Sequence, residues 1–188
     1  MSELIDELLA DAKGRMEKAV DSGRGEFATV RTGRASPHLL DRLEVDYYGT
    51  QTPLKQLAQI AATDARTLTI TPFDKSSIEG IEKSVTESDL GLTPSNDGTV
   101  IRLTLPELTE ERRKELVKVL HGVAEDARVA IRNVRRDVLG ELRELKKDGS
   151  AGSDEEHRAE EGLQKLTDTS VGEVDEMLKA REQEILEV

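Results

Sequence analysis

The chain has 188 residues, a formal net charge of −12 and no cysteine. Charged residues make up 35% of it and aromatic residues only 2%, which disfavours an all-β sandwich or barrel and an RNA-binding module that stacks bases on aromatic side chains. Without cysteine, disulfides and thiol catalysis are excluded, and because no apolar run approaches the length of a membrane span, we expect a cytoplasmic protein that does not contact membranes.

The first predicted element is a long amphipathic helix over Glu3–Val30. Its apolar residues recur every three or four positions, which is typical of a helix in a bundle: Ile5, Leu9, Ala12, Met16, Ala19, Gly23, Phe27 and Val30. The helical pattern ends in the segment RTGRASP (31–37), where Gly33 and Pro37 are helix stop signals.

The apolar pattern changes between residues 31 and 106. Alternation of apolar and polar residues predicts strands at 43–47, 67–71 and 100–105, and Ser77–Glu87 is predicted to be a short helix. Residues 49–53 have the composition of a turn, residues 54–61 are mixed, and residues 92–98 predict a loop. We therefore expect a small α/β domain over residues 31–106.

Two further long helices are predicted after residue 106. The first follows Thr109, a suitable N-cap, and its apolar pattern continues for about 38 residues, or about 57 Å. The second begins near Ser153, which forms a capping-box pattern with Glu156. The sequence predicts an α+β fold, in which a discontinuous antiparallel three-helix bundle (residues 1–30 and 107–188) carries the small α/β domain as an insertion.

Positive charge is concentrated in the second long helix. Residues 111–147 carry 11 basic and 7 acidic side chains, whereas residues 148–188 carry 4 basic and 13 acidic ones. Residues spaced by three and four share one helix face, and here they form what we call the basic stripe: Lys114, Lys118, His121, Glu125, Arg128, Arg132 and Arg135. Arg113 and Arg136 flank it.

The basic stripe allows two interpretations. Guanidinium groups match phosphate oxygens, so the stripe could lie along a nucleic-acid backbone. Alternatively, it could be a solvated face whose cations pair with the acidic third helix. The segment RTGRASP likewise could be an ordinary linker or a hinge.

Several stretches resemble the bacterial ribosome recycling factor family. They occur in the family's order and together extend over essentially the whole chain: RTGRASP (31–37), DYYG (46–49), TPL (52–54), QLA (56–58), SDLGL (88–92), LTEERR (108–113), AIRNVRRD (130–137) and, more weakly, LTD (166–168).

The resemblance implies an L-shaped monomer, without a cofactor, that binds the 70S ribosome after termination. Together with elongation factor G and its GTP hydrolysis, it would separate the ribosomal subunits so that mRNA and tRNA leave. Contacts with large-subunit rRNA carry over to Arg113, Arg132 and Arg135, with Arg128 and Arg136 as supporting contacts. The family's hinge carries over to Arg31, Thr32, Gly33 and Arg34 in the first linker and to Leu105 and Pro106 in the second.

Two other classes of function remain as alternatives. An acidic helical adaptor or chaperone partner would also be rich in helix, but it would not bind RNA in a salt-sensitive way. An enzyme would need a nucleophile or a base at a recognisable spacing, and His38, His121 and His157 have no such neighbours. We therefore expect no catalytic site.

Overall fold

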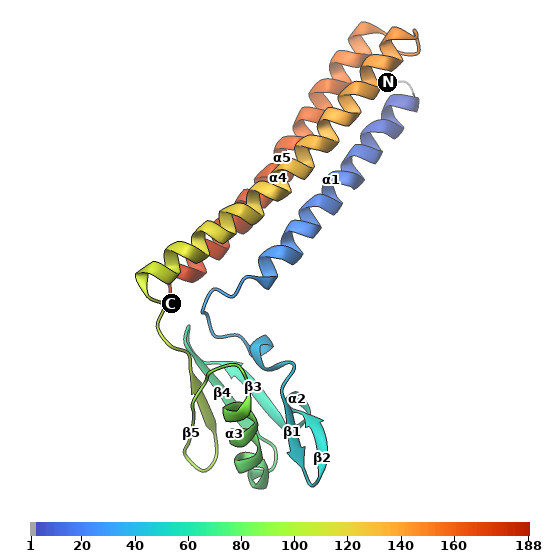
Figure 1. Cartoon of the computed structure of the whole chain (residues 1–188). Helices are drawn as coiled ribbons and strands as arrows, with labels where there is room; N and C mark the ends of the chain where they lie inside the picture. The colour runs from blue at the N-terminus through green and yellow to red at the C-terminus, as the bar shows by residue number, and fades with distance from the viewer. Residues whose placement is uncertain (1–2) are drawn as a thin grey trace. The chain divides into compact units, whose positions relative to one another are not determined.

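The computed structural model describes residues 3–188, which form two compact units (Figure 1). The bundle unit comprises the residues up to Arg31 together with Arg113–Gln183. The sheet unit comprises Thr32–Arg112 together with Glu184–Val188. Each unit has its own buried core, so each is described separately.

Three helices build the bundle unit: α1 (Glu3–Thr29), α4 (Glu110–Lys147) and α5 (Ser153–Leu186). They lie side by side in Figure 1, and α4 runs opposite to α1 and α5. Their apolar faces bury a common core that includes Ile5, Met16 and Phe27 of α1, Leu120, Ile131 and Leu142 of α4, and Leu163 and Val174 of α5. The predicted discontinuous antiparallel bundle is confirmed.

The contact between α1 and α4 is close at Gly23. A Cβ atom built on Gly23 would lie 3.1 Å from the Cβ of Ala127, which is nearer than ordinary van der Waals contact. Farther along the same pair of helices, Arg15 Nη2 donates to Asp137 Oδ2 at 2.9 Å. An added Cβ at position 23 would therefore require Ala127 to shift by a few tenths of an ångström.

The two later helices begin with different caps. Thr109 Oγ1 accepts a hydrogen bond from the Arg112 amide at 3.1 Å, which confirms the predicted N-cap of α4. The predicted capping box of Ser153 with Glu156 is wrong, because Ser153 is already the first helical residue of α5. Glu155 instead reaches back to the Gly152 amide at 3.4 Å, and the buried Glu156 pairs with Lys146.

The sheet unit contains a hairpin and a four-stranded antiparallel sheet. The hairpin joins β1 (Glu44–Tyr47) to β2 (Thr50–Pro53), and the sheet has the order β3-β4-β6-β5. These four strands are β3 (Ala58–Ala62), β4 (Thr67–Pro72), β5 (Pro94–Asn96) and β6 (Ile101–Thr104). The helices are α2 (Leu54–Leu57) and α3 (Ile78–Glu87), with short 3-10 turns at Pro37–Leu40 and Lys75–Ser77.

The core of the sheet unit lies between the strands and α3. Strands β1, β4 and β6 confirm the predictions from alternation, and their inward residues are fully buried together with Ile81 and Val85 of α3: Val45, Leu68, Ile70, Ile101 and Leu103. The predicted helix at 77–87 is likewise confirmed as α3.

Three segments of the sheet unit differ from the prediction. Residues 50–53 are strand β2 rather than a turn, and they pair with β1 in the register Val45↔Thr52. The mixed segment 54–61 divides into α2 and β3, and the predicted loop at 92–98 contains the edge strand β5. Strands β2, β3 and β5 are each formed by backbone hydrogen bonds to a neighbouring strand, and their side chains show no alternation that would reveal it.

Candidate nucleic-acid interface

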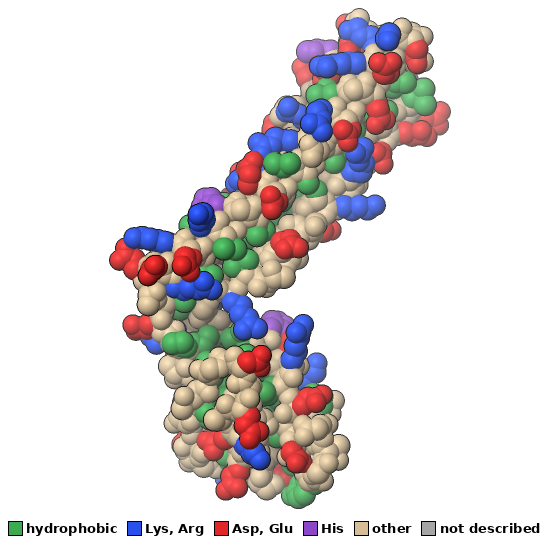
Figure 2. All heavy atoms as spheres, viewed as in Figure 1, with side chains coloured by type: hydrophobic (Ala, Val, Ile, Leu, Met, Phe, Trp, Pro, Cys, Tyr) green, Lys and Arg blue, Asp and Glu red, His purple; other side chains and the backbone are tan. Residues whose placement is uncertain are grey.

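The basic stripe follows α4 along a face that is displaced from its buried apolar residues, and several of its members contact α5. Lys114, Lys118, His121 and Arg132 are exposed, and Arg128 and Arg135 are half-buried. On the face of the bundle shown in Figure 2, basic and acidic side chains are interspersed rather than segregated. The stripe is therefore a row of cations with carboxylates close by.

Arg128 is held by α5 rather than presented to solvent. Its Nε and Nη2 donate to Asp175 Oδ1 at 2.9 and 2.5 Å, and its Nη1 lies 3.3 Å from Glu125 Oε2. The hydrogen bond to Asp175 raises the pKa of the Arg128 guanidinium, and the side chain is only 22% exposed. Arg128 therefore fits the second interpretation of the basic stripe, in which its cations pair with the acidic third helix.

The arginines farther along α4 are more accessible. Arg132 pairs with Glu125 of its own helix and is 50% exposed. Arg135 Nη1 donates to Gln164 Oε1 of α5 at 2.7 Å. Arg136 is exposed and has no ion-pair partner among residues 3–188, whereas Arg113 is half-buried near the start of the helix. Among the arginines of the basic stripe and its flanks, Arg132 and Arg136 are therefore the most exposed.

The histidines show no arrangement that suggests catalysis. His38 and His157 have largely exposed side chains beside Asp41 and Glu161, and His121 Nε2 lies 2.5 Å from Glu182 Oε1. Within residues 3–188, no cluster of three His, Asp or Glu side chains could hold a metal ion. Over the same residues, none of the helices combines the length and the apolarity that a bilayer crossing requires.

The first linker is tied to the end of the chain. Thr32 Oγ1 donates to Glu184 Oε2 at 3.1 Å, and Arg34 Nη1 lies 2.5 Å from Glu187 Oε2. Between them, Gly33 has a φ of +78° and packs against Leu108, whose atoms would lie 3.0 Å from an added Cβ. Both the left-handed backbone and the close contact require glycine here. Arg31 is exposed.

The second linker is anchored by Arg66, which sequence analysis did not single out. The Leu105 amide donates to Arg66 O at 2.7 Å, and the Arg66 guanidinium donates back to Leu105 O from Nε and Nη2 at 3.2 and 3.1 Å. A further bond from Arg66 Nη1 reaches Glu107 Oε1 at 2.8 Å. Leu105 is buried and Pro106 is exposed. No pattern around Arg66 indicates this role, because its partners lie about forty residues away in the chain.

Arg181 of α5 is a second residue that sequence analysis missed. Its Nη2 donates to the carbonyl oxygens of Phe27 and Val30 at 2.8 and 2.6 Å. These carbonyls are at the end of α1, where helical backbone oxygens lack partners within the helix. Arg181 therefore caps α1 immediately before the first linker.

Comparison with known proteins places the chain in a family. A family model described as ribosome recycling factor matches residues 24–186. The ribosome-recycling factor of Shouchella clausii is 56% identical over 182 residues, which are 97% of this chain and 98% of that protein. The one of Rubrobacter xylanophilus is 50% identical over 188 residues and is matched over the full length of both chains.

Solved structures agree with the sequence comparison. A solution structure of the ribosome recycling factor has a TM-score of 0.71 and 41% identity, with full coverage of both chains. A second similar chain, with a TM-score of 0.64, 44% identity and coverage of 97% and 98%, comes from models of the T. thermophilus ribosome recycling factor and the E. coli elongation factor G bound to the E. coli post-termination complex. With the family model spanning most of the sequence and relatives this similar over almost their whole length, the chain belongs to the ribosome recycling factor family.

Proposed function

We propose that this chain binds the post-termination ribosome and, together with elongation factor G and GTP hydrolysis, separates it into subunits. Messenger RNA and tRNA are then released for a new round of translation. Membership of the ribosome recycling factor family is the observation that carries this proposal. Because ribosomes of bacteria are cytoplasmic, the protein works in the cytoplasm.

In this function the chain itself breaks no covalent bond. The GTPase supplies the free energy, and this chain transmits displacement to the contacts between the subunits. Such a task needs a firm hold on the ribosome and an internal joint, and it needs neither a cofactor nor an active site.

The hold on the large subunit is assigned to arginines of α4. Arg132 and Arg136 are exposed, and Arg135 lies beside them, so they are the main phosphate contacts, with Arg113 near the start of the helix. Arg128 supports them mainly by keeping α4 fixed on α5, since Asp175 already occupies its guanidinium. Binding through phosphates weakens as salt increases.

The joint is assigned to the two linkers, with residues 1–30 and 107–188 as one domain and residues 31–106 as the other. The first linker is Arg31–Arg34 and the second is Leu105–Pro106. The φ of +78° at Gly33 supports this assignment, because a few residues at the ends of elements absorb the backbone rotation when a hinge moves.

The proposal is tested by light scattering of post-termination ribosomes, with and without elongation factor G and GTP. The wild-type chain should dissociate the ribosomes only when both are present. The double variant Arg132→Glu/Arg135→Glu should lose dissociation and co-sedimentation with large subunits while its circular dichroism spectrum stays helical.

A matched control makes the same change of charge in the sheet unit. Arg42 and Lys55 are exposed and have no ion-pair partner among the described residues, so Arg42→Glu/Lys55→Glu should retain binding to the large subunit. A folded Arg132→Glu/Arg135→Glu variant that still binds at the wild-type level would contradict the assigned RNA contacts. A wild-type chain that never binds ribosomes would favour the adaptor alternative.

A further inference from the structure

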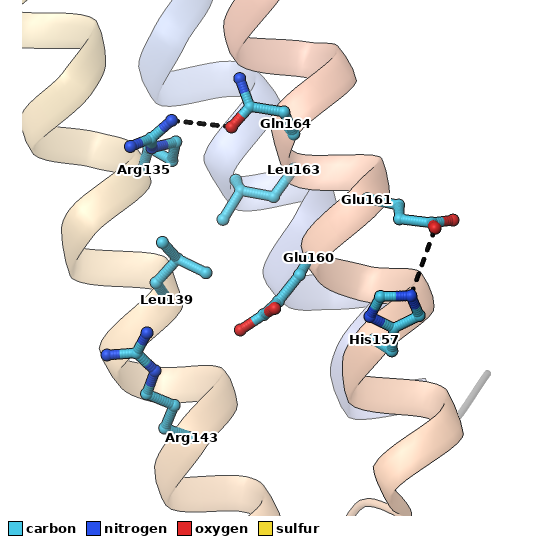
Figure 3. A pocket seen from close by; sticks show the side chains of 8 residues that line it. All are labelled: Arg135, Leu139, Arg143, His157, Glu160, Glu161, Leu163 and Gln164. Carbon is cyan, nitrogen blue, oxygen red and sulfur yellow. Dashed lines mark hydrogen bonds and ion pairs between the residues drawn. The ribbon is translucent and has the colours of Figure 1, made fainter.

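A groove with a volume of about 330 Å³ lies between α4 and α5 on the bundle unit (Figure 3). This volume is at the lower end of the range of small-molecule sites, about 300–1,000 Å³. The groove adjoins the arginines at 132–136 on the same helix, so a nucleic acid on those arginines would pass beside it.

The groove has an apolar part, and hydrogen bonds hold the polar side chains at one of its ends. Leu139 of α4 and Leu163 of α5 project between the helices, and Leu163 is completely buried. At one end, Arg135 donates to Gln164 Oε1 at 2.7 Å, and Gln164 Nε2 donates in turn to Asp168 Oδ1 at 2.7 Å. These contacts fix the Arg135 and Gln164 side chains beside a surface that a flat apolar face can cover.

The opposite end carries a guanidinium and a carboxylate without partners. Arg143 of α4 and Glu160 of α5 line the groove in Figure 3. Neither forms a hydrogen bond or ion pair with the other or with any other residue in 3–188, and Glu160 is only partly accessible. Glu161, which also lines the groove, lies 3.4 Å from His157 on its own helix. Arg143 and Glu160 are therefore available to a ligand between the helices.

The chemistry of this pair selects one nucleobase. A guanidinium only donates hydrogen bonds, and a carboxylate only accepts them. Guanine carries two adjacent donors, N1–H and the N2 amino group, which fit a carboxylate, and it carries the acceptors O6 and N7, which fit an arginine. Cytosine and adenine offer a carboxylate only one amino group, and uracil offers it only one imide N–H.

We propose that this groove binds an unpaired guanine of the ribosomal RNA, with Glu160 accepting from N1–H and N2 and Arg143 donating to O6 and N7. Leu139 contacts the face of the base. Recognition of splayed-out bases is the usual way in which proteins read RNA sequence. This inference rests on the proposed function, because the ribosome supplies the guanine.

The test titrates the full chain, labelled with ¹⁵N, with GMP, AMP, CMP and UMP, which share a phosphate and differ in the base. GMP should shift the amide resonances of 139–143 and 157–164 and bind at least about tenfold more tightly than the other three, as expected for loss of one bidentate pair. Glu160→Gln should lose this preference. Glu173→Gln on the exposed side of α5 removes the same charge and should keep it.

The outcomes distinguish a failure of the guanine site from a failure of the proposed function. Equal binding of all four nucleotides, or an unchanged GMP preference in Glu160→Gln, would overturn the guanine site even if the wild-type chain binds ribosomes normally. A GMP preference in a chain that fails to co-sediment with large subunits would overturn the proposed function and the assignment of the guanine to ribosomal RNA, while the groove would still be a guanine site. If Glu160→Gln loses GMP but binds large subunits at the wild-type level, the guanine is not ribosomal and the inference fails.

Discussion

Arg128 and Arg132 are one helical turn apart on α4, yet they have different partners. Asp175 on the neighbouring helix holds Arg128, which is 22% exposed, whereas Arg132 pairs with Glu125 of its own helix and is 50% exposed. Spacing along one helix places both side chains on the same face, but it cannot show which of them meets a carboxylate from another helix. The position of α5 decides that.

We predict that Arg128 contributes more to stability than to RNA binding. In a double-mutant cycle of Arg128→Ala and Asp175→Ala, urea unfolding followed by far-UV circular dichroism should give a coupling energy of about 1 kcal/mol. Arg132→Ala with Asp175→Ala should give no coupling, because the structure joins Arg132 to Glu125 and not to Asp175. A coupling of zero for Arg128 with Asp175 would refute the structural role.

A second prediction concerns pH and the turn between β5 and β6. Asp97 Oδ1 accepts from the Val100 and Thr99 amides at 2.9 and 3.0 Å, and Oδ2 accepts from Arg102 at 3.1 Å. The two amides are the main reason that the pKa of Asp97 is lowered in the folded chain. A carboxyl with a lowered pKa stabilises the fold above its unfolded pKa, and this contribution is lost as the pH falls through the folded value.

Asp97→Asn should therefore lower the melting temperature of the sheet unit at neutral pH, and the difference from wild type should shrink as the pH falls from about 5 to about 2. Asparagine retains the Oδ1 acceptor and loses the charge and the bond to Arg102. Tyrosine fluorescence measures this melting. Asp89→Asn serves as the control, since Asp89 is exposed and has no ion pair or hydrogen bond from its side chain among residues 3–188. A difference that grows towards acid pH would contradict the sign.

At the scale of elements, periodicity predicts the parts of the fold that bury a continuous apolar face. The regularly spaced apolar residues from Ile5 to Phe27 predict α1, and those that follow Thr109 predict α4. Strand β2 is missed because its residues Thr-Gln-Thr-Pro are exposed or half-buried and pair with β1 only through the backbone. The candidate site is likewise predictable only in part. The sequence predicts α4 and the face that carries its arginines, but the contacts of these arginines with α5 depend on how the two helices pack.

The glycines of α1 give a prediction with its own control. Replacing a helical glycine by alanine stabilises the helix by about 1 kcal/mol when space allows. Gly25 has open space around its Cβ position, whereas at Gly23 the added Cβ would lie 3.1 Å from Ala127. Thermal unfolding should show that Gly25→Ala raises the melting temperature and that Gly23→Ala does not. A rise of equal size in both variants would mean that α1 and α4 are not in close contact.

At the scale of the whole molecule, the chain offers a separate spectroscopic probe for the sheet unit. Tyr47 and Tyr48 are the only tyrosines, and there is no tryptophan, so tyrosine fluorescence reports on the sheet unit. The long helices dominate far-UV circular dichroism. Because each unit buries its own core, the two signals should change at different temperatures, a departure from two-state unfolding.

Ile81→Ala should lower the fluorescence transition while the circular dichroism transition stays in place. Ile81 is completely buried in the sheet unit, and truncation of such a residue costs about 2–5 kcal/mol. Leu120→Ala, at a completely buried position of the bundle, is the reciprocal variant. Equal shifts of both transitions by either variant would show that the units unfold as one.

The proposed joint makes a prediction about motion in solution. If the linkers Arg31–Arg34 and Leu105–Pro106 allow the units to reorient, residual dipolar couplings of the two units should fit two different alignment tensors. Gly33→Ala should change the difference between the two fitted alignment tensors, because alanine is strained at a φ of +78°. One tensor that fits both units of the wild-type chain would contradict the hinge.

The pairing of the α4 arginines with nearby carboxylates has a consequence for the lifetime of the complex. Arg132 already pairs with Glu125, so the rRNA phosphate that we propose for Arg132 would replace one negative partner with another. Such an exchange yields less affinity per arginine than an arginine without an ion-pair partner would. The logarithm of the binding constant should therefore fall less steeply with the logarithm of the salt concentration than the roughly 0.9 ions per contact of simple phosphate neutralisation. Short occupancy suits a factor that has to leave each ribosome before it can serve the next.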